Sequence, residues 1–115
     1  MTIAQKLTQV VDQFVAENGS ETIMSYGDLY DLTLSEYFIR KSSFLPSDYC
    51  YNRTNDGLDF ESHIHLFEWV DVGSYRLLGS SYPYSGTVYY RKKGESVDSV
   101  YGQWGNGVFQ KAHLT

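Results

Sequence analysis

The densest group of chemically capable side chains lies between residues 46 and 54, where the chain reads Pro-Ser-Asp-Tyr-Cys-Tyr-Asn-Arg-Thr. An Asn amide can pair bidentately with adenine, an Arg guanidinium with guanine, and a hydroxyl with a base or a phosphate. The segment therefore predicts a nucleic-acid contact surface, with an ordinary solvated helix as the alternative. Its candidate contact residues are Ser47, Tyr49, Asn52, Arg53 and Thr54.

Further candidate contacts lie on either side of this segment. Arg40 and Lys41 precede it, and both are expected to hold phosphates. Arg76 lies in a later apolar stretch, and Tyr84 belongs to a Tyr-Pro-Tyr loop that could stack an exposed base. Arg91-Lys92-Lys93 is a second short basic run, although short basic runs are more often plain solvated surface.

The net charge of −5 argues against a non-specific grip on a polyanion. The charge is uneven along the chain. Residues 1–39 hold a single Lys against six acidic residues, whereas residues 40–93 hold seven basic residues against six acidic ones. A local basic face on an acidic protein is therefore compatible with the composition.

Enzymatic and metal-binding signatures are missing from the sequence. There is no glycine-rich phosphate loop, nucleophile elbow or His-Glu-x-x-His motif. The single cysteine, Cys50, excludes an internal disulfide and a cysteine zinc site, and it reads as a small buried hydrophobe. His63 and His65 alternate with Asp59 and Glu61, but without a third well-spaced ligand they predict an exposed polar strand face. We expect no enzyme activity, no cofactor and no metal.

Neither a membrane span nor a signal peptide is visible, so a cytoplasmic protein is expected. The chain instead begins with an amphipathic helix over about 3–17, capped by Thr2 and Gln5. Ser25 can cap a second helix that reaches towards Arg40. Pro46 suits the first position of a short third helix that runs to Arg53.

The pattern changes from helical period to alternation at about residue 57. Residues 66–78 predict two strands around Gly73, and residues 87–91 and 99–104 predict a second hairpin. A hairpin placed after helices is typical of the wing of a winged-helix domain. The fold prediction is thus one α+β domain over 1–115: three helices within about 1–57, then a wing and antiparallel β-hairpins within about 58–110.

Four runs of the chain resemble a group of small bacterial winged-helix domains. They are residues 44–52 (FLPSDYCYN), 66–70 (LFEWV), 73–79 (GSYRLLG) and 82–86 (YPYSG). Such domains occur alone or beside restriction-type nucleases, where they can read modified DNA. The resemblance implies that Ser47, Tyr49, Asn52 and Arg53 lie on the reading helix and Arg76 on the wing. The acidic turn Asp71-Val72-Gly73 departs from the more basic wing turn of that group.

Two functions follow as hypotheses. The first is a non-enzymatic winged-helix module that binds duplex DNA, modified or sequence-specific, in a restriction or phage-defence context. The second is a phage or mobile-element protein that binds and inhibits a host protein, in the manner of anti-restriction or anti-CRISPR inhibitors, because Tyr is enriched at interfaces. A DNA reader should gather Arg40, Lys41, Arg53 and Arg76 on one face. A DNA mimic should present carboxylates from its first two helices.

Overall fold

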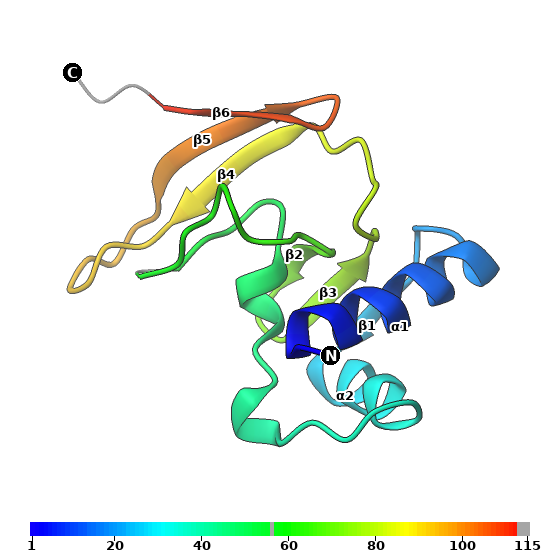
Figure 1. Ribbon diagram of the computed structural model, residues 1–115. Helices are drawn as coiled ribbons and strands as arrows, with labels where there is room; N and C mark the ends of the chain where they lie inside the picture. Colours follow the sequence, from blue (N-terminus) through cyan, green and yellow to red (C-terminus); the bar gives the residue numbers. More distant parts are fainter. Residues whose placement is uncertain (56, 113–115) are drawn as a thin grey trace.

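The computed structural model describes residues 1–55 and 57–112 and shows an α+β protein with two antiparallel sheets (Figure 1). Helices α1 (Ile3–Asn18) and α2 (Tyr26–Leu34) lie in the N-terminal part. The first sheet has the strand order β1-β3-β2, and the second has the order β4-β5-β6. The strands are β1 (Ile23–Ser25), β2 (Phe67–Asp71), β3 (Ser74–Leu77), β4 (Gly86–Tyr90), β5 (Ser99–Gly105) and β6 (Val108–Lys111).

The winged-helix prediction is wrong. Where a third helix was expected, the structure has only the 3-10 turns η1 (Lys41–Ser43) and η2 (Pro46–Tyr49), after which the backbone becomes extended at Cys50. Strand β1 pairs with β3 and makes the hairpin around Gly73 part of a three-stranded sheet. That hairpin therefore belongs to a sheet, and no third α-helix precedes it in the described residues.

Helix α1 follows its sequence signals closely. The Thr2 side chain accepts a hydrogen bond from the Gln5 N–H at 3.1 Å, and the Gln5 side chain accepts one from the Thr2 N–H at 2.9 Å, which confirms the predicted capping box. Gly19, with φ of 83°, ends the helix in a conformation that favours glycine. No helix in the described residues is both long and apolar enough to cross a membrane.

A largely aliphatic core lies between the two helices and the first sheet. Tyr26 and Tyr30 seal one side of it, each with its ring edge-on to Phe44 at 5.2 Å between centroids. Their hydroxyls donate to the carbonyls of Phe44 and Ile39, so these half-buried rings keep their hydrogen bonds. The side chains with no exposed surface are Leu7, Val11, Leu29, Phe44, Leu66, Phe67 and Leu77.

Residues 49–54 form a joining segment between the two sheets. At its start the Tyr49 carbonyl accepts from the Leu66 N–H at 2.7 Å, and the Tyr51 N–H donates to the Phe67 carbonyl at 2.8 Å. At its end the Thr54 N–H donates to the Tyr89 carbonyl at 3.0 Å. The segment forms parallel bridges with both β2 and β4. These long-range hydrogen bonds stabilise an extended backbone in a segment that the local sequence predicts as helix.

The second core is built mainly of aromatic rings between the joining segment and the second sheet. Tyr51 stacks on Tyr84 at 5.1 Å between centroids and meets the Trp104 ring edge-on at 5.4 Å. Phe109 reaches this cluster across Gly102, where a Cβ atom would lie only 2.5 Å from the Phe109 ring. Glycine is therefore required in the middle of β5, since any side chain there would displace the ring.

Candidate functional site

The structure uses Asn52, the expected base-reading amide, to hold the protein's own backbone. Its Nδ2 donates to the Trp69 carbonyl at 2.9 Å, and its Oδ1 accepts from the Trp69 N–H at 2.8 Å. The amide thus makes two hydrogen bonds to the backbone of one residue, as it was predicted to make two with adenine.

Arg53 is similarly engaged. Its two terminal nitrogens donate to the Asp98 carboxylate at 3.3 and 3.2 Å, and its guanidinium lies 4.9 Å from the centre of the Trp69 ring. Arg91 Nε donates to the same carboxylate at 3.2 Å. These arginines hold the pKa of Asp98 below its usual value, chiefly through the Arg53 hydrogen bond. Arg53 and Arg91 are therefore both engaged in pairing within the protein.

Arg76 and Tyr84 converge on Glu68. Arg76 Nη1 donates to one carboxylate oxygen at 2.6 Å, and the Tyr84 hydroxyl donates to the other at 2.8 Å. Burial, followed by the Glu68 hydrogen bond, raises the pKa of Tyr84 above its ordinary range. The Tyr84 ring is itself buried, so it is not presented for stacking on an external base.

The remaining predicted contact residues are scattered. Tyr49 is buried against the His63 ring at 4.7 Å, and Thr54 is buried under the second sheet. Ser47 accepts a weak hydrogen bond from Asn55 at 3.4 Å. Arg40 and Lys41 are exposed at the turn after α2, far along the chain from the basic run at 91–93. Arg53 and Arg76 are each paired with a carboxylate of the protein, Asp98 and Glu68 respectively, whereas Arg40 and Lys41 form no ion pair in the described residues.

Cys50 and His65 both occupy the interior. Cys50 has no exposed surface, and burial raises the pKa of its thiol. The expected exposed strand face at 59–66 is wrong, because those residues form turns and His65 lies inside. Its Nδ1 donates to the Cys50 carbonyl at 3.1 Å, and burial lowers its pKa to about 4. No cluster of three metal-ligating side chains occurs in residues 1–55 and 57–112.

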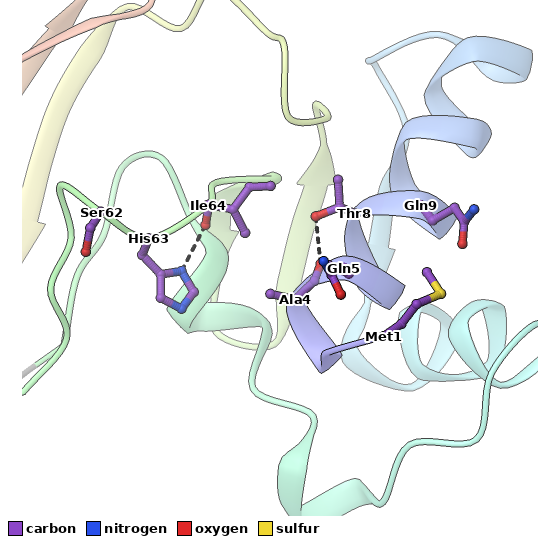
Figure 2. Close-up of a pocket in the computed structure, with 8 residues that line it drawn as sticks. All are labelled: Met1, Ala4, Gln5, Thr8, Gln9, Ser62, His63 and Ile64. Atoms are coloured by element: carbon purple, nitrogen blue, oxygen red, sulfur yellow. Dashed lines mark hydrogen bonds between the residues drawn. The ribbon is translucent and has the colours of Figure 1, made fainter.

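A groove of about 660 Å³ separates the start of α1 from residues 62–64 (Figure 2). One wall comes from the first turns of α1, and the other comes from the chain just before β2. The α1 wall consists of Met1, Ala4, Gln5, Thr8 and Gln9, and the opposite wall consists of Ser62, His63 and Ile64.

The groove has an apolar interior and a rim of amide, hydroxyl and imidazole side chains. Ala4 and Ile64 are continuous with the aliphatic core, and the Thr8 hydroxyl is already donated to the Ala4 carbonyl at 2.7 Å. None of the lining residues is Asp, Glu, Lys or Arg. His63 Nδ1 lies 3.0 Å from the Ile64 carbonyl, which can only accept, so in the neutral ring Nε2 is the acceptor. The arrangement suits an uncharged ligand with an apolar body.

The groove has no local sequence signature. Its walls lie more than fifty residues apart in the chain, and neither contains a recognised motif. Gln5 and Gln9 lie one helical turn apart, but this spacing is equally typical of a solvated helix face. Sequence reasoning missed the site because only the tertiary fold brings residues 62–64 against α1.

Comparison with known proteins gives a relative and a family. The "Uncharacterized protein YnaC" of Bacillus subtilis (strain 168) is 43% identical over 77 residues, which is 66% of this chain. The match spans only 28% of that longer protein. No solved structure matches. Residues 2–111 match the family described as "Domain of unknown function (DUF7225)", and the chain therefore belongs to that family.

Proposed function

We propose that this domain is a protein-binding module whose groove between α1 and residues 62–64 holds an uncharged, apolar segment of a partner polypeptide. The observation that carries the proposal is the chemistry of the groove: about 660 Å³, an apolar interior, and no Asp, Glu, Lys or Arg on its walls. This function corresponds to the protein-partner hypothesis. A host or defence protein as that partner remains a prediction from the sequence.

The rim favours a peptide over a purely apolar small molecule. Gln5 uses its side-chain oxygen to cap α1, and Gln9 accepts from the Tyr37 hydroxyl through its own side-chain oxygen. The amide NH₂ of each glutamine thus stays available as a donor for a carbonyl. Across the groove, Nε2 of a neutral His63 is an acceptor for an N–H. A peptide offers both kinds of backbone group beside an apolar side chain.

Binding of duplex DNA is the competing function, and the charge distribution supports it less. Arg53, Arg76 and Arg91 are paired with Asp98 or Glu68. Arg40, Lys41, Lys92 and Lys93 are exposed but lie on separate turns. Phosphate contacts from several basic side chains on one face normally supply the affinity of non-specific binding. We also propose a cytoplasmic location, where a single buried thiol such as Cys50 stays reduced.

A titration monitored by amide chemical shifts tests the proposal with three probes: a capped leucine dipeptide amide, a capped lysine dipeptide amide and a short DNA duplex. We expect the leucine probe to shift the amides of Ala4, Thr8 and Ile64 in a saturable way, with a Kd on the order of 1 mM for so small a ligand. The lysine probe should bind more weakly, because burying its ammonium in an uncharged groove has no compensation.

Two matched substitutions on α1 supply the control. Ala4 lines the groove, whereas Ala16 is exposed on the same helix outside it. Ala4→Glu should weaken binding of the leucine probe at least tenfold, and Ala16→Glu should leave it unchanged. Equal effects of the two variants would contradict the proposal. Tighter binding of the duplex than of the leucine probe at about 0.15 M salt would favour the DNA function instead.

A further inference from the structure

A second, smaller pocket lies at the far end of the β4–β5–β6 sheet, separate from the groove. It encloses about 260 Å³ between residues 54–55 and 57–58, the end of β4, the start of β5 and the end of β6. The residues that matter chemically are Thr54, Asn55, Tyr90, Tyr101 and Lys111. None of them lines the groove between α1 and residues 62–64.

Lys111 gives this pocket a positive charge. Its ammonium lies 5.3 Å from the centre of the Tyr101 ring. It forms no ion pair with a carboxylate in the residues that the structure describes. Arg53 and Arg91, by contrast, share the Asp98 carboxylate, and Arg76 pairs with Glu68. An ammonium held against an aromatic ring beside a concave surface is an attractive partner for an anion.

Thr54 provides a second and independent indication. The residue is only 4% exposed and lines the inner wall of the pocket. Within residues 1–55 and 57–112 its hydroxyl has no hydrogen-bond partner. An unsatisfied buried hydroxyl destabilises the folded protein, and such groups call for an explanation in terms of a bound ligand or a functional role.

The other walls limit the shape of the ligand. Tyr90 and Tyr101 meet nearly at right angles, at 83° with 5.9 Å between centroids, so they form an aromatic corner. Asn55 at the mouth donates to Asp48 through Nδ2 at 2.8 Å, which leaves its side-chain oxygen as an acceptor. A volume of about 260 Å³ admits a ligand about the size of one substituted ring.

We propose that this pocket is a binding site for a small organic anion, a planar apolar body that carries one carboxylate or one phosphate monoester. The anionic group pairs with Lys111, and the planar body packs into the corner of Tyr90 and Tyr101. The Thr54 hydroxyl becomes satisfied when the ligand is present. The pocket is separate from the groove. The protein thus has one proposed site for a small molecule and another for a protein partner.

Titration of the full chain with benzoate, phenyl phosphate and adenosine monophosphate tests the site. Saturable shifts of the amides of Thr54, Tyr101 and Lys111 are expected for at least one probe. Tighter binding of benzoate identifies a carboxylate ligand, and tighter binding of either phosphate identifies a phosphate monoester. The absence of a saturable shift at these three amides for all three probes would overturn the proposal.

Two variants separate the site from general charge and from folding. Lys111→Met should weaken binding at least tenfold, whereas Lys93→Met, which removes an exposed charge outside the pocket, should not; equal losses would overturn the site. Thr54→Val should raise Tm of the free protein by roughly 3 °C, because an unsatisfied hydroxyl is removed. The same variant should weaken binding roughly fivefold, the value of one hydrogen bond. A lower Tm together with unchanged binding would refute the role of Thr54.

Discussion

The two halves of this small protein are stabilised by different means. The first half consists of α1, α2 and the β1-β3-β2 sheet, and it buries aliphatic side chains such as Leu7, Leu29 and Leu77 completely. The second half consists of the β4-β5-β6 sheet and the aromatic cluster beside it. Within the described residues it has no helix, and its buried rings keep hydrogen-bond partners. The Tyr51 hydroxyl donates to the Gly79 carbonyl at 2.6 Å, and Trp104 Nε1 donates to the Tyr51 carbonyl at 2.8 Å.

This difference predicts different sensitivities. Aliphatic burial is non-directional and scales with area, so the first half should respond mainly to lost volume. Aromatic packing with buried hydrogen bonds is directional, so the second half should respond to geometry and protonation. The two proposed binding sites follow the same division: the uncharged groove borders the aliphatic core, and the anion pocket borders the aromatic one.

The largest expected effect comes from removing a fully buried ring in the first half. Phe67 has no exposed surface, so Phe67→Ala should lower the free energy of unfolding by about 3–5 kcal/mol through lost burial and a residual cavity. Phe109, at the partly exposed end of the aromatic cluster, is the matched control, and Phe109→Ala should cost about 1–2 kcal/mol. Urea unfolding measures both. Equal costs would mean that the two halves are not stabilised differently.

Lowering the pH should destabilise the folded protein through the second half, where His65 is buried. Burial lowers the pKa of His65 from 6.5 to about 4, so the unfolded chain binds the proton more tightly than the folded one. Stability is therefore fully present above pH 6.5 and is lost as the pH falls through the window from about 6.5 to 4. The loss should approach about 3 kcal/mol. Urea midpoints measured at about pH 7.5 and about pH 4.5, on either side of most of this window, give the difference.

Two histidine variants identify the group responsible. His65→Phe keeps a ring in the cluster and removes the titration, so it should abolish most of the dependence between pH 6.5 and about 4. His63→Phe changes the neighbouring half-buried histidine and should leave that dependence in place. Asp98 also loses stabilisation on acidification, but because its pKa is lowered from 3.8, its contribution falls below this window. An unchanged pH dependence in His65→Phe would show that another group is responsible.

The sequence predicts the elements with local signals and misses those that depend on distant partners. The α1 capping box and the hairpin at Gly73 are encoded within a few residues, and both are present. The joining segment at 49–54 was predicted as a helix, because Pro46 and the polar residues after it suit a helix start. Its extended form depends on hydrogen bonds to Phe67 and Tyr89, which lie at least sixteen residues away.

The candidate site residues show the same limit. Residue type identified Asn52, Arg53 and Arg76 as good hydrogen-bonding groups, and the structure bears this out in their contacts. Residue type does not reveal whether the partner is a nucleic acid or another part of the chain. Here Trp69, Asp98 and Glu68 supply the partners, and the first two are sixteen or more residues away in sequence. The groove was missed for the complementary reason, since its walls consist of ordinary residues.

The smallest of these effects concerns the connection between the halves. Asn52→Ala removes both hydrogen bonds to the backbone N–H and C=O of Trp69. At roughly 1 kcal/mol for each bond, it should lower the free energy of unfolding by about 2 kcal/mol. Asn52→Asp keeps the acceptor for the Trp69 N–H but places a carboxylate oxygen against the Trp69 carbonyl. It should therefore be no more stable than the alanine variant.

The chain has two tryptophans, and each reports on one half: Trp69 belongs to the first sheet and Trp104 to the second. Fluorescence of Trp104→Phe and Trp69→Phe backgrounds can thus follow the two halves separately. If the joining segment couples them, Asn52→Ala should move both urea midpoints together. Separate midpoints would show two independently unfolding halves. A change in stability below about 0.5 kcal/mol, combined with a lost preference among DNA duplexes, would contradict this. It would indicate instead that Asn52 reads bases, as its residue type first suggested.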